Sequence, residues 1–170
     1  IYRIIPSIPQ VDNISLQPGV APSLSSGLLD PHEIMFSPDY KNYFITCQNS
    51  NEVRVMNTAA DTLQKIISVG KYPLEMAVSK NKNLLFVTCQ EDNNPIYPFF
   101  KGSVYVIDLN TLTVVKKIYE KFYQPHGIGI DDKRGLLYVS STNSNPTGPA
   151  PHHASECGGR NGFFHVIDLN

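Results

Sequence analysis

The sequence has no tryptophan, only three cysteines in 170 residues, and almost no net charge. The cysteines Cys47, Cys89 and Cys157 are too few and too far apart for a disulfide scaffold, and an odd number leaves at least one unpaired within the chain. The net charge of -1 provides no overall field that would attract nucleic acid or an anionic membrane. We therefore do not expect a nucleic-acid partner.

Long hydrophobic runs are absent as well. No stretch approaches the roughly 18 to 20 apolar residues that cross a bilayer, so we expect no transmembrane segment. Residues 1–9 lack the basic start and the apolar core of a signal peptide, which favours a mature, trimmed or partial chain. The 41% of hydrophobic and 17% of charged residues are typical of a folded domain.

The common catalytic signatures are also absent. The sequence contains no Gly-x-Ser-x-Gly elbow, no phosphate-binding glycine-rich loop, no His-Glu-x-x-His and no Cys-x-x-Cys-His haem attachment. Whether the protein is an enzyme stays uncertain at this stage, and these absences favour a protein that is not one.

What the sequence does contain is an internal repeat. A proline-led segment occurs three times, at offsets of 42 and 52 residues, and an apolar segment follows it at the same two offsets. The proline-led copies are Pro31–Ser37, Pro73–Ser79 and Pro125–Asp131, and the apolar copies are Tyr43–Gln48, Leu85–Gln90 and Leu137–Thr142. Two segments that agree on one spacing define a repeated structural unit.

Each repeat contains four short segments rich in β-branched and aromatic residues. The third segment occurs as Val53–Asn57, Val104–Asp108 and Phe164–Asp168, and the fourth as Leu63–Gly70 and Val114–Glu120. Turn residues separate the segments, which predicts four antiparallel strands per repeat. Four-stranded units of roughly 40 to 45 residues are the blades of a β-propeller. The predicted fold is therefore all-β, with about two and a half propeller blades.

The repeats also predict the organisation of the chain. Residues 1–30 end a preceding blade or form a connection, residues 31–72 form one blade, residues 73–124 form a blade with an insertion at 91–102, and residues 125–170 form an incomplete blade with an insertion at 143–162. Closed propellers have about four to eight blades. We expect the missing blades to come from further sequence or from other chains.

The strands resemble those of the YVTN family of propeller repeats. Leu85–Thr88 and Leu137–Ser140 occupy the place of that family's Tyr-Val-Thr-Asn signature, and Val104–Asp108 is similar to its following strand. The resemblance covers about residues 31–170 and implies a seven-bladed propeller.

The connections between the second and third strands grow along the chain, from 3 to 12 to 20 residues. They are Asn49–Asn51, Glu91–Gly102 and Asn143–Gly162. Insertions of this length are more often functional than ordinary turns. In a propeller blade they emerge on the face where the first strand begins, so we expect a protein, glycan or small-molecule ligand at this loop-rich face.

Two histidines, His32 and His126, follow the repeated proline and should lie near the mouth of the central channel. They could contact a ligand, or they could be turn residues whose rings bind neighbouring backbone. Leu74 holds the equivalent position in the second repeat, so the fold tolerates an apolar side chain there.

The longest insertion contains His152, His153 and Cys157, which are plausible ligands of a transition metal, with Glu156 beside them. The alternative is a structured loop or a loop that contacts a partner. The shorter insertion carries Tyr97, Phe99 and Phe100 toward the same face. These aromatic residues could form a ligand surface or pack on the neighbouring loop.

Four further residues are considered. Arg160 adds positive charge to the loop-rich face and is a candidate ligand contact. For His165, Cys47 and Cys89 we expect packing roles inside the sheets.

The leading hypothesis is a non-enzymatic propeller that binds ligands or proteins, or helps assembly, and is periplasmic, exposed at the cell surface or secreted. The alternative is the propeller part of a metal- or haem-dependent oxidoreductase, because the repeat type is similar to the propellers of nitrite and nitrous-oxide reductases. A third possibility is hydrolase or lyase chemistry at a channel metal, for which Glu33, Glu75 and the histidines are available.

Overall fold

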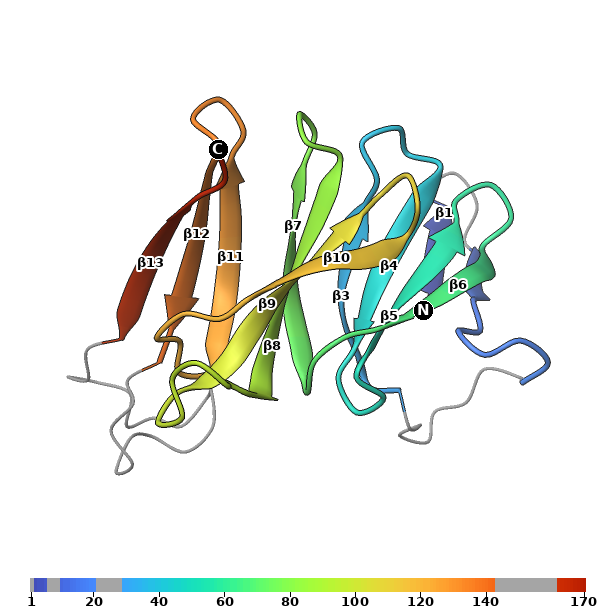
Figure 1. Cartoon of the computed structure of the whole chain (residues 1–170). Coiled ribbons are helices and arrows are strands. Elements are labelled where there is room, and N and C mark those ends of the chain that lie inside the picture. Colours follow the sequence, from blue (N-terminus) through green and yellow to red (C-terminus); the bar gives the residue numbers. More distant parts are fainter. Residues whose placement is uncertain (1, 6–9, 21–28, 143–161) are drawn as a thin grey trace.

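The computed structural model describes residues 2–5, 10–20, 29–142 and 162–170, and every regular element in these ranges is a β-strand (Figure 1). The first complete sheet has the order β3-β4-β5-β6, and all its pairs are antiparallel. Its strands are β3 (Pro31–Phe36), β4 (Asn42–Cys47), β5 (Glu52–Asn57) and β6 (Thr62–Ser68). The first repeat therefore forms one four-stranded meander, as its segments predict.

The second and third repeats form two further antiparallel sheets. The second sheet contains β7 (Pro73–Ser79), β8 (Leu84–Asn93), β9 (Lys101–Asp108) and β10 (Thr113–Ile118). The third contains β11 (Pro125–Asp131), β12 (Leu136–Ser141) and β13 (Phe163–Asp168). The three sheets stand side by side with β7 between β3 and β11, so the first strand of each repeat is the innermost (Figure 1).

The core lies between adjacent sheets. Phe44 of β4 and Leu85 of β8 belong to one buried cluster, and Phe86 of β8 and Leu137 of β12 belong to a second. Strand β8 therefore contributes to both clusters, with successive side chains facing opposite neighbours. This arrangement covers strand β8 on both faces. It also explains why that strand is an uninterrupted apolar run.

A threonine in the second strand links each sheet to the next one. The Thr46 Oγ1 accepts a hydrogen bond from the Glu33 backbone N–H at 3.1 Å and donates to the Leu74 carbonyl oxygen at 2.7 Å. The next repeat reproduces this link: Thr88 accepts from the Glu75 N–H at 3.1 Å and donates to the His126 carbonyl oxygen at 3.0 Å. These bonds set the spacing of the three innermost strands.

The start of each innermost strand carries the same irregularity. Pairing with the second strand shifts between Pro31 and Ile34 in β3, and it shifts at the equivalent positions of β7 and β11. One extra residue on the inner strand produces the shift, which is the geometry of a β-bulge. A bulge re-aims the side chains it contains, and here these are the two residues that follow each repeated proline.

Residues before the first complete sheet form a short hairpin of β1 (Tyr2–Ile5) and β2 (Gln10–Asn13). Leu16 packs with Tyr43 and Ile45 of the first sheet, and its carbonyl oxygen accepts a hydrogen bond from Arg54. That residues 1–30 end a preceding blade stays a prediction.

The insertion of the second repeat is partly strand. β8 continues to Asn93 and β9 begins at Lys101, where these two residues pair, so only residues 94–100 form the connection. The expected boundaries of 91–102 were wider because regular strand extends into the insertion from both sides. Among the described residues, none lies in a helix that could cross a membrane.

Candidate functional site

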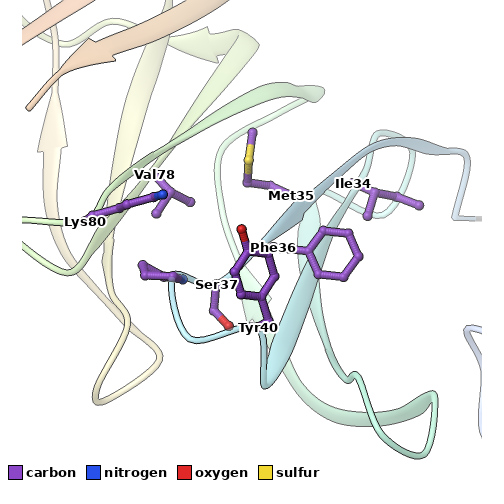
Figure 2. A pocket seen from close by; sticks show the side chains of 8 residues that line it. Ile34, Met35, Phe36, Ser37, Tyr40, Val78 and Lys80 are labelled. Atoms are coloured by element: carbon purple, nitrogen blue, oxygen red, sulfur yellow. The ribbon is translucent and has the colours of Figure 1, made fainter.

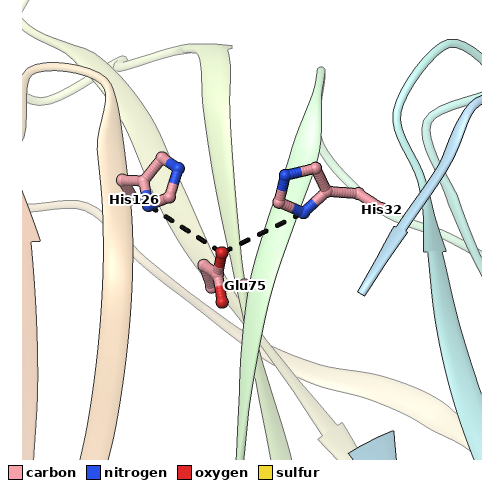
Figure 3. A group of neighbouring side chains, drawn as sticks. All are labelled: His32, Glu75 and His126. Atoms are coloured by element: carbon pink, nitrogen blue, oxygen red, sulfur yellow. Dashed lines mark ion pairs between the residues drawn. The ribbon is translucent and has the colours of Figure 1, made fainter. Parts of the chain in front are cut away.

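Three innermost strands bring His32, Glu75 and His126 together at the end of the sheets where these strands begin (Figures 1 and 3). The Glu75 Oε1 lies 4.0 Å from the Nδ1 of His32 and 3.9 Å from the Nδ1 of His126. The two imidazole rings have centroids 6.2 Å apart and meet edge to face, at 84°. One residue from each of three successive blades thus faces a common point.

The three residues hold unequal positions in their repeats. His32 and His126 are the first residues after the repeated proline, whereas Glu75 is the second. In the middle blade Leu74 is buried, at 3% exposure, and it is Glu75 that extends between the two histidines (Figure 3). The side chains of His32, Glu75 and His126 remain 34%, 28% and 26% exposed, so solvent reaches the group.

A second carboxyl group, that of Glu33, adjoins the cluster. It accepts a hydrogen bond from the Met76 backbone N–H and hydrogen-bonds to Glu75. Burial and, next, the neighbouring charge of Glu75 together raise the pKa of Glu33 to about 8, against the lowering effect of the hydrogen bond from the Met76 N–H. A protonated Glu33 can therefore donate a hydrogen bond to Glu75 at neutral pH.

The sequence predicted that the two histidines lie near the channel mouth, which stays a prediction, and the structure places their rings beside each other. Their role as ligand contacts stays a prediction. Glu75 was anticipated only as one available carboxylate for the hydrolase possibility. A sharper signal was present, because the repeated proline is followed two residues later by Glu33 and Glu75, in strands that are otherwise mostly apolar.

The other predicted residues divide into two groups. His152, His153, Cys157 and Arg160 lie outside the described residues, and their roles stay predictions. Tyr97, Phe99 and Phe100 lie in or beside the connection between β8 and β9.

Within this connection the three aromatic side chains are not equivalent. Tyr97 and Phe100 contact each other with ring centroids 6.2 Å apart, and the Lys121 ammonium lies 5.7 Å from the Tyr97 centroid. Phe99, in contrast, is 90% exposed. The predicted aromatic cluster is thus a contacting pair with one ring projecting into solvent.

His165 packs as expected inside the third sheet. Its ring meets that of Phe122 edge to face with centroids 4.8 Å apart, and its Nε2 is 3.2 Å from the Ser141 hydroxyl. Burial lowers the pKa of His165, opposed by the charge of Glu120. Cys47 and Cys89 are both free and fully buried, which agrees with their expected packing role.

A separate pocket with a volume of about 340 Å³ lies where the end of β3 meets β7 (Figure 2). Apolar residues dominate its lining, which includes Met35, Phe36, Tyr40 and Val78. None of the predicted ligand residues lines it, so it is distinct from the histidine and glutamate group.

One curated protein and several solved structures resemble the chain. Antigen Lp49 of Leptospira interrogans is 32% identical over 95 residues, which is 53% of this chain and 21% of that protein. The chain therefore spans about a fifth of this relative. No family model matches the sequence.

The similar solved structures match a larger share of the chain than the antigen does. Hydrazine synthase of Kuenenia stuttgartiensis has a TM-score of 0.58 at 24% identity, over 74% of this chain and 32% of that one. A Bacteroides caccae protein of unknown function has a TM-score of 0.58 at 15% identity, over 82% and 46%. The WD40 repeats of RRP9 have a TM-score of 0.57 at 11% identity, over 71% and 35%. The fold is that of a β-propeller.

At these sequence identities the similarity to solved structures is evidence for the fold alone. The chain spans less than half of each of these proteins. The propeller prediction, with four-stranded antiparallel blades, is therefore confirmed. Membership of the YVTN family and the seven-blade type stay predictions.

Proposed function

We propose that this chain is part of a non-enzymatic, YVTN-type propeller that binds another protein through the loops at the end where β3, β7 and β11 begin. The observation that carries the proposal is Phe99, a large aromatic side chain that is 90% exposed on a short connection at this end. Aromatic side chains, phenylalanine included, are enriched in protein interfaces relative to the rest of the surface.

Internal hydrogen bonds order the connection that carries Phe99. The Asn94 side chain donates to the Glu120 carbonyl oxygen at 2.7 Å and accepts from the backbone N–H groups of Ile96 and Tyr97 at 3.0 and 2.9 Å. A loop ordered before binding loses less conformational entropy when a partner arrives. Phe99 therefore projects into solvent from an ordered loop, in which the rings of Tyr97 and Phe100 contact each other.

Two other features support the same face. β12 ends at Ser141 and β13 begins at Phe163, and these residues pair with each other, so the predicted insertion of 143–162 begins and ends at this end of its blade. Arg160 lies within that insertion and is proposed as a polar contact. The proposal assigns both insertions to one partner surface, with a glycan or a small molecule as the alternative ligand.

Exposed apolar side chains on the first and third sheets are a reason to propose further blades. Phe36 of β3 is 46% exposed, and Val166 of β13 is 54% exposed. In a closed propeller such side chains pack against the next blade. We propose that blades outside the described sheets complete the ring, and the experiments below accordingly use the full-length protein.

Site-specific photo-crosslinking in the native host tests the surface. A photoreactive phenylalanine analogue at position 99 of the full-length protein should yield a discrete crosslinked protein, identified by mass spectrometry. The matched control places the same analogue at Tyr40, which is 65% exposed on the turn between β3 and β4 of the first sheet, at the opposite end of the strands. No adduct at position 99, or the same adducts at both positions, would contradict the proposal. Adducts of glycan alone would favour the alternative ligand.

We also propose that the protein is exported, to the periplasm, the cell surface or the medium. The similarity to a Leptospira protein named as an antigen supports this location. Fractionation of cells that express the full-length protein should recover it outside the cytoplasm. Recovery in the cytosol alone would overturn the assignment.

A second candidate function is the propeller part of a metal- or haem-dependent oxidoreductase. The group of His32, Glu75 and His126 favours it, because imidazole nitrogens and a carboxylate oxygen are ligands of redox-active metals. An absorbance spectrum of the purified full-length protein tests it. Bands of copper, iron or haem that respond to a reductant would support this function, and a spectrum without such bands would favour the binding protein.

A further inference from the structure

We propose that His32, Glu75 and His126 form a binding site for a divalent transition-metal ion, with Zn²⁺ as the best-matched ion. One donor atom from each residue lies within 4.8 Å of the other two. In both histidines the Nδ1 faces the same carboxylate oxygen (Figure 3). The site is independent of Phe99, so either proposal can fail without the other.

The donor set matches zinc chemistry. Two imidazole nitrogens and one carboxylate oxygen are common zinc ligands, and three protein ligands leave one position for water or a bound molecule. Calcium and magnesium instead prefer sites made of oxygen ligands. The two nitrogens therefore select a transition metal.

The distances are close to those of a loaded site. Zinc bonds of 2.0 to 2.2 Å in a tetrahedron place neighbouring donors about 3.3 to 3.5 Å apart. The observed separations of 4.0 and 3.9 Å exceed this by about half an ångström. The donor atoms of the two histidines lie within 4.8 Å of each other, so binding of an ion requires the three partly exposed side chains to rotate toward it.

The backbone around the three residues is held in place. Thr88 accepts a hydrogen bond from the N–H of Glu75 and donates one to the carbonyl oxygen of His126. Glu33, which follows His32, is held by the Thr46 hydroxyl and by the Met76 N–H. Its hydrogen bond to Glu75 is also the kind of outer contact that orients a ligating carboxylate.

The same side chains could instead form an ion-paired group without a metal. Titration of metal-depleted full-length protein with Zn²⁺, followed by calorimetry, separates the two possibilities. We expect about one equivalent to bind at this site. Glu75→Gln and His126→Ala should each weaken binding at least about 100-fold, because loss of a direct ligand should exceed the typical effect of removing an outer contact.

Two controls sharpen the titration. His165→Gln changes a histidine outside the group and should leave the affinity unchanged. A variant with His152→Ser, His153→Ser and Cys157→Ser removes the predicted ligands of the long insertion and should also retain the site. Binding that survives Glu75→Gln and His126→Ala, or no binding to the unaltered protein, would overturn the proposal.

X-ray absorption at the zinc edge of the unaltered protein provides a test that needs no variant to fold. The proposal predicts nitrogen and oxygen neighbours only, with the scattering pattern of two imidazoles. Sulfur in the first shell, or no imidazole scattering, would refute it. The first of these results would assign the ion to a cysteine-containing site.

Discussion

The Thr88 hydroxyl lies 3.0 Å from the backbone carbonyl oxygen of His126, across the boundary between two blades. The same hydroxyl accepts a hydrogen bond from the Glu75 N–H at 3.1 Å, and Thr88 is fully buried. One side chain therefore holds the backbone of two of the three residues in the candidate site.

Thr88→Val should destabilise the full-length protein by about 1 to 3 kcal/mol, because valine keeps the shape but leaves buried backbone groups without a hydrogen-bond partner. Chemical denaturation followed by circular dichroism measures the change. Thr113→Val, at an exposed position on β10, is the matched control and should change stability by less than about 0.5 kcal/mol. Equal effects of the two substitutions would contradict the structural role of the threonine.

Gly102→Ala should destabilise the protein by at least about 2 kcal/mol, by overpacking combined with an unfavourable backbone conformation. Gly102 has φ of +102°, and an added Cβ would lie 2.1 Å from Cδ of Pro125. The control is Gly129→Ala, where the added Cβ would meet nothing within 4 Å. Thermal unfolding of both variants is the measurement, and a melting temperature for Gly102→Ala equal to that of the control would disprove the close contact.

Cys47 and Cys89 should resist alkylation in the folded protein at pH 8. Burial raises the pKa of Cys47 to about 11 and that of Cys89 further above its ordinary value, so little thiolate is present to react. Both side chains are also inaccessible. Mass spectrometry after brief alkylation should find these cysteines unlabelled in the native protein and labelled in denaturant. Equal labelling in both states would show that the blades do not bury them.

His165 should make stability fall as the solution is acidified below about pH 6.5. Burial lowers the pKa of His165 in the folded state, so the unfolded chain binds a proton first as the pH falls. The stabilisation is present above the unfolded pKa and is lost as the pH falls through the folded pKa. His165→Gln should reduce this slope in denaturation curves measured between pH 7.5 and 5.5. An unchanged slope would locate the dependence elsewhere.

Much of the fold could be predicted from residue spacing. The proline-led segments became β3, β7 and β11, and the apolar segments became β4, β8 and β12. The prediction succeeded because strands buried between sheets need continuous apolar residues and the turns between them need particular backbone conformations. It was less accurate for the second insertion, since β8 extends to Asn93 through backbone pairing that side-chain types do not reveal.

The candidate site was only partly visible in the sequence. His32 and His126 were noticed because they occupy the same position in two repeats. Glu75 belongs to the position after, and sequence alignment alone places it beside Glu33 and Gly127 instead. The contact between these unequal positions depends on how the three sheets pack side by side.

The sequence alone determined the repeat, the four-strand pattern and the position of each histidine near a strand start, because these properties depend on local residue order. Tertiary structure decided that Glu75, with Leu74 buried beneath it, lies between His32 and His126. The reason is geometric: donor atoms from residues more than 40 positions apart meet only when three sheets pack at one spacing, which the buried clusters and the threonine bridges determine.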